Sequence, residues 1–423
     1  MTEPDIDPGR LLRRLRHLSR IGRQAGGGIS RPGFSQAAID AANYIASESR
    51  DDGLVARTDA GGNLLIGRPG PRRCARALLV GSHLDTVVNG GWLDGAYGVV
   101  AALEAVGVVA SHRLDLGVDP IAVAFANEEG ALFPQAFWGS QVLAGTLDAG
   151  TVPLTDYHGC SLREALARSG GNIDALGTAA WAPQSLAGYL ELHIEQGPVL
   201  ESSGTPIGVV EAITGRVVLG AEFLGRAAHA GTTPMDQRAD ALLGAAHLAV
   251  AVSELPGLGL CRVATVGRVE VSPASANTIA GGAHMTIDLR DSSERRLAEA
   301  ESVVRRRIAA IAARYGLRAE CRGLVHSRPA TTDQALRQTI SDTAKDLGLP
   351  AMDLTSGAGH DAQIMAAITP IGMIFAPSIG GVSHAPEEDT RPADLIAGAR
   401  VLLGTVLRVG GHGRKEWDAS PPS

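Results

Sequence analysis

The segment ALLVGSHLDTVVNGGWLDGAYGVVAALEAV, residues 77–106, contains the pattern that decides the fold. It begins with a short apolar run, Ala77 to Gly81, which is typical of a buried strand. From about Asp94 it continues as a mostly apolar stretch with the length of a helix, which ends near Ser111. A second short apolar run, Ile121 to Ala126, follows. Strand, helix and strand in this order predict a βαβ unit, and therefore an α/β fold with a buried sheet.

Outward from this segment, the pattern predicts two domains. Helices are expected upstream, and a strand is expected at Tyr189 to Ile194. Residues 212–327 differ in rhythm, since two short strands, a helix, two strands and a helix predict a compact α+β unit. We therefore expect a discontinuous first domain, residues 1–211 and 328–423, with the second domain, 212–327, inserted into it. The upstream helices are expected at Arg10 to Arg20 and Ser35 to Ser49.

The composition excludes several classes of protein. The 423 residues include 38 basic and 45 acidic side chains, a net charge of −7, so we expect no nucleic-acid partner. An acidic N-terminus and the absence of a run of eighteen apolar residues predict no secretory signal and no membrane partner. Four separated cysteines without a CxxC pair suit a reducing compartment, and we expect a cytoplasmic protein. The 53 glycines are about one residue in eight, which is an excess over the usual share.

Polar residues follow the predicted strands at points where a sheet delivers side chains into a crevice. The first strand runs into His83 and Asp85, which share one face by period-two alternation, so that the carboxylate can hold the imidazole from behind. Asp94 lies where the next helix opens. Each residue alone has an ordinary interpretation, because His83 could be structural and Asp94 could be a helix N-cap.

Three further positions complete a possible ligand set. The strand at Ile121 to Ala126 runs into Glu128 and Glu129, which are costly to bury unless they bind cations or share a proton; a solvated turn is the alternative. His193 lies in the run LELHIEQG, and His384 lies in the glycine-rich loop SIGGVSHAP. Two or three histidines with two or three carboxylates form a donor set for borderline divalent metals.

The ordered motifs of this chain resemble those of the M20-type dinuclear metallohydrolases, specifically the hydantoinase/carbamoylase branch. That branch includes N-carbamoyl-L-amino-acid hydrolases, allantoate amidohydrolases and β-ureidopropionases. The motifs run from about Gly26 to Leu407 and are GSHLDTVVNGGWLDGAYG, ANEEG, ELHIEQGPVLE, GRAAHAGTTPMDQRADAL, ANTIAGGAHMTIDLRD, SGAGHDAQ and PSIGGVSHAPEE. The resemblance implies a mixed-sheet catalytic domain with an inserted α+β domain that acts as a lid and dimerises.

The resemblance also implies roles for the strand-end residues and two divalent ions per subunit. The implied metal ligands are His83 and His193 for one ion and Glu129 and His384 for the other, with Asp94 bridging. Zinc is the first expectation, and manganese, cobalt or nickel also suit such ligands. Glu128 resembles the general base, and Asp85 resembles the partner that orients His83. Two cations sharing a carboxylate can lower the pKa of water toward neutrality, and Glu128 can carry its proton to the leaving nitrogen.

Further residues match substrate-binding positions of the family. In the inserted domain, His229 matches a catalytic histidine that reaches a neighbouring active site, and Asn277 and Arg290 match residues that hold the substrate carboxylate. In the first domain, Gln196 and His360 match positions that line the substrate. An arginine is the natural bidentate anchor for a carboxylate. Without the resemblance, Arg290 would be interpreted as the ion-pair partner of a neighbouring aspartate, and His229 as a surface histidine.

The activity that these expectations support is hydrolysis of the ureido C–N bond of an N-carbamoyl-L-amino acid, which releases the amino acid, ammonia and carbon dioxide. The alternative is allantoate amidohydrolase, which would use the same metals and base. A dinuclear aminopeptidase is disfavoured by His193 and Arg290, because a free α-amino group would want an acid as its partner. A catalytically dead scaffold is disfavoured because no implied ligand is missing. We expect a small-molecule carbamoyl acid as the substrate and a homodimer formed through the inserted domain.

Overall fold

The computed structural model describes residues 4–70, 76–148, 150 and 152–411. This part of the chain divides into two compact units. The first includes residues up to Glu211, residues 331–356 and residues from His360 onward. The second comprises residues 212–330 and 357–359. Residues 328–330 and 357–359, assigned to the first domain from the sequence, therefore group with the second unit. One reason is that Arg290 in that unit donates a hydrogen bond to the carbonyl oxygen of Gly357 at 2.8 Å.

The first unit is built on a mixed sheet, in which nine strands pair among the described residues in the order β1-β2-β4-β3-β5-β15-β6-β13, with β14 beside β6. Strands β3, β4, β5 and β15 run parallel to their neighbours in this group, whereas β1, β2 and β6 pair antiparallel. The expected α/β fold with a mixed sheet is confirmed. The strands are β1 (Val55–Thr58), β2 (Leu64–Gly67), β3 (Ala77–His83), β4 (Asp119–Phe125), β5 (Leu186–Ile194), β6 (Ile207–Ile213), β13 (Ala330–Thr331), β14 (Ala351–Ser356) and β15 (Ile371–Ala376).

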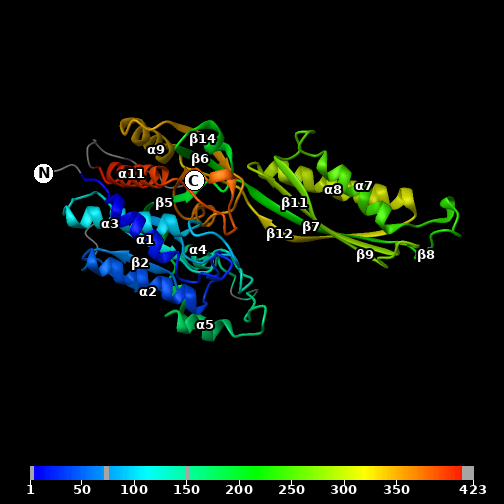
Figure 1. The fold of residues 1–423 in the computed structure, drawn as a ribbon, viewed down its shortest axis with the longest axis horizontal. Helices are drawn as coiled ribbons and strands as arrows, with labels where there is room; N and C mark the ends of the chain where they lie inside the picture. The colour runs from blue at the N-terminus through cyan, green and yellow to red at the C-terminus, as the bar shows by residue number, and fades with distance from the viewer. Residues whose placement is uncertain (1–3, 71–75, 149, 151, 412–423) are drawn as a thin grey trace. The chain divides into compact units, whose positions relative to one another are not determined.

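Helices pack on this sheet because its strands are apolar on both faces. Helix α3 packs against β3, β4 and β5, and helices α1, α3 and α11 lie side by side (Figure 1). The helices of the first unit are α1 (Pro8–Leu18), α2 (Gln36–Asp51), α3 (Ala96–Ser111), α4 (Trp138–Ala144), α5 (Leu162–Arg168), α6 (Val199–Ser203), α9 (Gln334–Asp346), α10 (Asp361–Met365) and α11 (Pro392–Val409), with 3₁₀ turns at Ile173–Thr178, Pro183–Ser185 and Ile379–Gly381.

A buried ion-pair cluster holds the N-terminal helix in place. Arg14 of α1 is 1% exposed and contacts Glu104 of α3 at 2.6 Å. The same guanidinium contacts Glu48 of α2 and Asp52, each at 2.8 Å. Because Glu104 is fully buried, removing this arginine would leave a carboxylate with less compensation in the core.

The second unit is an antiparallel sheet with two helices on one face. Among its described residues, four strands pair in the order β12-β7-β11-β9 and two short strands, β8 and β10, pair with each other. The alternating burial of β11 turns Ala283, Met285, Ile287 and Leu289 toward the helices. The elements are β7 (Gly215–Leu224), β8 (Ala228–His229), β9 (Val263–Ser272), β10 (Thr278–Ile279), β11 (Gly282–Asp291), β12 (Arg318–Ser327), α7 (Ala241–Ser253) and α8 (Glu294–Tyr315), with a 3₁₀ turn at Met235–Gln237.

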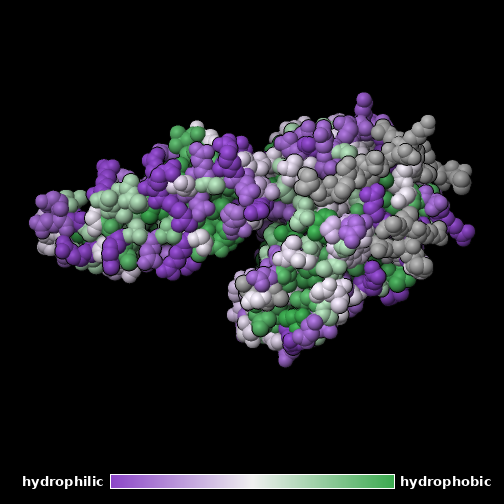
Figure 2. Space-filling model, turned by 180° about the vertical axis from the view of Figure 1, so that it is seen from behind, coloured by the Kyte–Doolittle hydropathy of each residue, from purple (hydrophilic) through white to green (hydrophobic). Residues whose placement is uncertain are grey.

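Two further properties concern the surface of the second unit and the length of the helices. Hydrophilic side chains predominate on the face of the second unit that Figure 2 shows on its left, with small hydrophobic patches between them. Within the described ranges, none of the helices is long and apolar enough to cross a membrane.

Candidate metal centre

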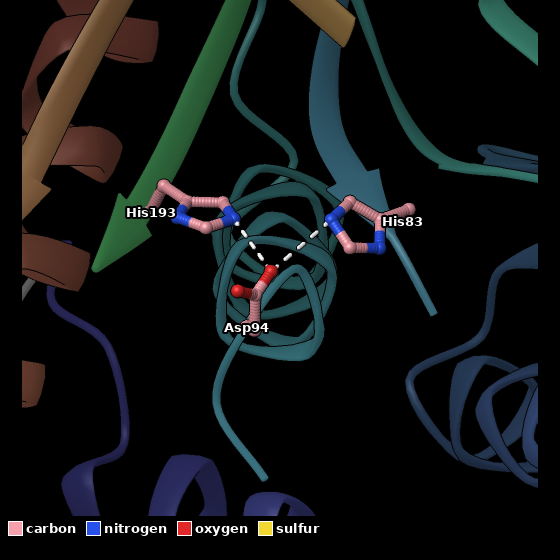
Figure 3. Close-up of side chains that lie close together, drawn as sticks. All are labelled: His83, Asp94 and His193. Carbon is pink, nitrogen blue, oxygen red and sulfur yellow. Dashed lines mark ion pairs between the residues drawn. The ribbon is translucent and has the colours of Figure 1, made fainter. Parts of the chain in front are cut away.

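Two histidines at the ends of neighbouring parallel strands point at one carboxylate. His83 is the last residue of β3, and His193 is next to the last residue of β5. Their Nε2 atoms lie 3.4 and 3.2 Å from Oδ1 of Asp94, which precedes helix α3 (Figure 3). All three side chains are at most 5% exposed. Parallel strand ends thus bring together, in one buried cluster, residues that are far apart in the sequence.

The hydrogen bonds of the two imidazoles define which ring nitrogen of each faces Asp94. Nδ1 of His83 lies 3.0 Å from the backbone carbonyl oxygen of Asp85, and Nδ1 of His193 lies 2.8 Å from that of Ile194. A carbonyl oxygen can only accept, so each Nδ1 carries a proton, and Nε2 is the ring nitrogen that faces Asp94. The backbone N–H of Gly95 also donates to Nε2 of His193, at 3.1 Å.

A second group of ligand-type atoms shares the same carboxylate. Nε2 of His384 lies 3.2 Å from Oδ2 of Asp94 and 3.4 Å from Oε1 of Glu129. Each of the two groups, His83–Asp94–His193 and Asp94–Glu129–His384, is close enough for its ligand atoms to hold one metal ion. The lone pair of an imidazole nitrogen and a carboxylate oxygen repel each other unless a cation or a proton lies between them. This donor set therefore fits a pair of divalent ions.

Asp94 is not a helix cap. The N-cap of α3 is Gly95, with φ 64°, and it makes no side-chain hydrogen bond. A Cβ atom at Gly95 would lie 2.4 Å from Cε1 of His83, so glycine is required both by the left-handed backbone and by the close approach of the imidazole. The carboxylate of Asp94 is therefore free to face the histidines.

Glu128 lies beside the cluster, and Asp85 holds it there. Oε2 of Glu128 is 3.7 Å from Nε2 of His83. The carboxylate of Asp85 accepts hydrogen bonds from the backbone N–H groups of Glu128, at 3.0 Å, and Glu129, at 3.1 Å. This contact differs from the one expected, because Asp85 orients His83 through its carbonyl oxygen while its carboxylate is 3.9 Å from the ring.

The acidic pair is enclosed rather than solvated. Side-chain exposure is 8% for Glu128 and 9% for Glu129, which excludes the solvated turn. Burial raises the pKa of Glu128 well above its ordinary value, and the nearby carboxylate of Glu129 adds to the rise. Burial also raises the pKa of Glu129 to about 7. The hydrogen bond to Asp94 raises the pKa of His384 to about 9. Without a cation, the cluster therefore favours extra protons on its ligand atoms.

Gln196 and His360 contact this cluster from the first unit. Nε2 of Gln196 donates to Oδ2 of Asp94 at 2.7 Å, whereas Oε1 of Gln196 is buried and has no hydrogen-bond partner among the described residues. The ring of His360 lies edge-on to that of His193, with centroids 4.8 Å apart, and its Nε2 is 2.8 Å from Oγ of Ser356. Burial lowers the pKa of His360 well below its ordinary value, so this imidazole is neutral.

The remaining predicted residues lie in the second unit. His229 is exposed, and its Nδ1 accepts from the N–H of Gly231 at 3.0 Å. Asn277 is also exposed. It directly precedes strand β10, which pairs with strand β8, the strand that contains His229. Arg290 is 30% exposed rather than buried, and its Nε donates to Asp288 at 3.0 Å. The structure therefore shows the ion pair that the sequence offered as the alternative for Arg290.

The profile of peptidase family M20/M25/M40 matches residues 79–408. The chain is 38% identical over 410 residues to an N-carbamoyl-L-amino acid amidohydrolase of Geobacillus stearothermophilus, with 96% of this chain and 99% of the relative covered. It is 34% identical to the allantoate amidohydrolase of Bacillus subtilis, with 93% and 95% covered. A crystal structure of a hydantoinase/carbamoylase family amidase from Burkholderia multivorans matches at 33% identity with a TM-score of 0.89, covering 98% and 100%.

The chain belongs to peptidase family M20/M25/M40. The resemblance drawn from the motifs is thereby confirmed, as is the expectation of a hydrolase. Candidate metal-binding groups of this M20 chain are formed by His83, Asp94, Glu129, His193 and His384.

Glu388, which was not among the residues predicted from the sequence, connects the parts of the M20 cluster. Glu388 is 1% exposed, and its Oε1 accepts from the N–H groups of Leu93, at 2.8 Å, and Asp94, at 3.1 Å. Its Oε2 accepts from Oγ of Ser383 at 2.7 Å, and the N–H of His384 lies 3.4 Å away. Glu388 thus connects the loops that carry two candidate ligands. It lies within the quoted motif PSIGGVSHAPEE, four residues after the histidine, which is the signal that could have identified it.

A second missed residue supports the segment behind His83. Arg31 is fully buried, and its Nε donates to the carbonyl oxygen of Leu84 at 2.5 Å. Its Nη1 donates to the carbonyl oxygens of Leu18 and Ile21, at 3.2 and 3.1 Å. Burial lowers the pKa of Arg31 to about 10, so the guanidinium stays charged near neutral pH. No pattern in the sequence distinguishes this arginine from a surface one.

Proposed function

We propose that the protein hydrolyses the ureido C–N bond of an N-carbamoyl-L-amino acid and releases the amino acid, ammonia and carbon dioxide. The observation that carries the reaction class is the pair of ligand groups sharing Asp94, with Glu128 beside them. The substrate class is supported by the relative that is 38% identical across nearly the whole chain and is named as an N-carbamoyl-L-amino acid amidohydrolase.

The cofactor in this proposal is a pair of divalent ions. His83 and His193 would hold one ion and Glu129 and His384 the other, with Asp94 common to both. Nitrogen and carboxylate donors of this kind suit zinc first, and also manganese, cobalt or nickel. When bound, such ions supply Lewis acidity toward a carbonyl oxygen and toward water.

In this proposal Glu128 moves the proton. Its backbone N–H donates to the carboxylate of Asp85, and burial raises the pKa of its side chain well above the ordinary value, so that the carboxylate can take up a proton. Glu128 would accept a proton from water at Oε2 and deliver it to the leaving nitrogen. Asp85 acts through the backbone of Glu128 and through His83, and is a positioning residue.

Polar side chains would orient the substrate. In the first unit, the unpartnered Oε1 of Gln196 is a buried acceptor that suits an N–H group of the ureido moiety. Neutral His360 would line the same space. From the second unit, we propose that Arg290 and Asn277 hold the substrate carboxylate and that His229 completes a site. The partly exposed guanidinium of Arg290 supports this role.

We further propose that the second unit is a lid through which the protein forms a homodimer. Strand β9 is an edge strand of its sheet, with Val263 45% and Val269 46% exposed. Helix α7 exposes Leu242, 45%, and Val250, 60%. An unpaired edge and exposed apolar side chains are features of an interface. A cytoplasmic location is supported by the exposed free thiol of Cys160, whereas Cys74 lies outside the described residues.

Allantoate hydrolysis is the second candidate. A relative named allantoate amidohydrolase is 34% identical over 398 residues. Allantoate also contains ureido groups and a carboxylate, so the same metal groups, Glu128 and Arg290 would serve it. The two candidates differ only in the pocket that receives the rest of the substrate.

The test is a substrate panel with detection of released ammonia. Purified protein would be stripped with a chelator and reloaded separately with zinc, manganese, cobalt or nickel. We expect turnover of N-carbamoyl-L-amino acids by the reloaded protein and none by the stripped protein. Faster turnover of allantoate would favour the second candidate. Absence of ammonia release from every carbamoyl amino acid and from allantoate would refute the proposal.

A further inference from the structure

A cavity of about 310 Å³ lies in the first unit, apart from the candidate metal centre. Helix α2 and strands β1, β2 and β4 contribute most of its wall, together with Phe34 and the end of α5. Among the described residues, its lining includes none of the five candidate metal ligands. A volume of roughly 300 Å³ is at the lower end of the range for small-molecule sites.

The inner wall of this cavity is apolar. Small and aliphatic side chains on one face of α2 meet the sheet there, and an aromatic ring closes the wall. These side chains are Ala38, Ile39, Ala42, Ala46, Leu64 and Phe125. A wall of this kind favours a ligand with an apolar body, since binding removes apolar surface from water.

Three arginines from separate elements line the same cavity. Arg50 comes from the last turn of α2, Arg57 from β1 and Arg168 from the end of α5. All three are exposed. Within the described chain, these guanidinium groups form no hydrogen bond and no ion pair. Asp85 is the single acid among the described residues of the lining, so the cavity is positive in a protein whose net charge is −7.

The acid that acts on Arg57 from outside the lining is already engaged. Oδ1 of Asp59 accepts from the N–H groups of Gly61, at 2.8 Å, and Asn63, at 3.0 Å, and Oδ2 accepts from the side-chain amide of Asn63 at 2.9 Å. The turn therefore occupies this carboxylate, and the guanidinium of Arg57 keeps its donors for a ligand. Free guanidinium groups match a carboxylate in charge and in geometry.

The cavity reaches the residue that precedes the acidic pair. Asn127 precedes Glu128 and lines the cavity; it is 1% exposed, and its Oδ1 has no hydrogen-bond partner among the described residues. Its Nδ2 is engaged with the carbonyl oxygens of Phe133 and Gln135. A ligand that carries a hydrogen-bond donor opposite its carboxylate would satisfy this buried acceptor.

From the positive lining, the apolar wall and this buried acceptor, we propose that the cavity binds a small carboxylic acid with an apolar body and a hydrogen-bond donor at its other end. Occupancy changes turnover through Asp85, which accepts from the backbone N–H of Glu128, and through Asn127, which precedes Glu128 in the chain; this second part rests on the proposed function. The cavity is thus a regulatory site of the enzyme, separate from the place where substrate reacts.

The binding test uses three probes of similar size and isothermal titration calorimetry of the whole protein. 4-Hydroxyphenylacetate carries both the carboxylate and the donor, phenylacetate lacks the donor, and tyramine carries an ammonium group in place of the carboxylate. We expect 4-hydroxyphenylacetate to bind most tightly, phenylacetate several-fold more weakly, and tyramine not at all. Equal affinity for tyramine would overturn the assignment of a carboxylate.

Variants separate this cavity from the substrate site. Replacing Arg57 and Arg168 together by glutamine is expected to weaken 4-hydroxyphenylacetate binding at least tenfold. The control Arg20→Gln, an exposed arginine outside the cavity, should bind normally, as should Arg290→Gln in the second unit. Unchanged binding by the double variant, or loss of binding in Arg290→Gln, would overturn the proposal. This measurement needs no catalytic activity, so it decides the site even if the proposed function fails.

Kinetics test the regulatory part. With an N-carbamoyl-L-amino acid as substrate, 4-hydroxyphenylacetate should change kcat of the parent protein without competing for substrate, and should leave kcat of the Arg57→Gln/Arg168→Gln variant unchanged. Purely competitive inhibition that persists in the double variant would overturn the regulatory role.

Discussion

Replacing Glu388 by glutamine tests whether the metal centre depends on a residue that no candidate ion touches. The carboxylate of Glu388 accepts from the N–H groups of Leu93 and Asp94 through one oxygen and from Ser383 through the other. Glutamine has nearly the same shape, but it is neutral and has only one acceptor oxygen. One side of the clamp would therefore face an amide group in place of an oxygen.

The contacts give the magnitude. A hydrogen bond to a charged acceptor is worth about 1 kcal/mol more than one to a neutral acceptor, so three close donors amount to about 3 kcal/mol. Part of this loss loosens the loops that carry Asp94 and His384. Residues that orient metal ligands typically contribute about 10- to 100-fold to metal affinity, which corresponds to roughly 1.4 to 2.7 kcal/mol. We therefore expect Glu388→Gln to bind zinc about 10- to 100-fold more weakly than the parent.

The assay is competition for zinc against a fluorescent chelator at fixed pH, with metal content measured independently. Glu387→Gln is the matched control, since the neighbouring glutamate is exposed and undergoes the same chemical change. Equal zinc affinity in the two variants would refute the inference that Glu388 fixes the loops that carry Asp94 and His384.

Three other outcomes are expected. Glu128→Gln should hold zinc almost normally and lose about 10²- to 10⁴-fold in kcat, as measured by ammonia release; normal turnover would show that another group moves the proton. In the metal-free cluster the pKa is raised to about 7 for Glu129 and to about 9 for His384, and these ligands must lose their protons to bind a metal. Zinc affinity should therefore rise between pH 6 and pH 9, with release of protons. Chelator competition that gives the same zinc affinity across this range would contradict the electrostatic account. Arg14→Met should lower the free energy of unfolding in urea by about 3 kcal/mol, because it breaks a buried cluster of ion pairs; the exposed Arg13→Met is the control, and equal unfolding midpoints would count against the cluster.

The predictable part of the site consists of residues fixed by strand periodicity and by local motifs. His83, Glu128 and His193 could be placed from the sequence because each follows or ends a short apolar run, and parallel strands end at one edge of a sheet. The ambiguity over Asp94 could not be resolved locally. Whether it caps a helix or faces a neighbour depends on the backbone of Gly95, whose positive φ reflects contact with a histidine twelve residues earlier.

The unpredicted part depends on contacts between segments far apart in the chain. Glu388 and Arg31 look like surface residues by composition, and only the folded chain shows their buried partners. Arg290 is partly exposed because its strand lies in a sheet with one open face, where alternation leaves the side chain in partial contact with solvent. In the strand order β12-β7-β11-β9, strands pair although helices separate them in the sequence, and no local pattern encodes such pairing.

Asp94 lies between His193 and His384, and these two histidines flank the whole inserted unit in the sequence. Two cations that share Asp94 would link these histidines and close a loop of roughly 190 residues, and closing a long loop removes chain entropy from the unfolded state in proportion to the logarithm of its length. Bound metal would therefore act as a removable cross-link between the two segments of the first unit that precede and follow the second unit in the sequence. The second unit itself need not be rigid. The insertion could then drift in sequence, or unfold and refold, without separating the two halves of the sheet that encloses the catalytic groups.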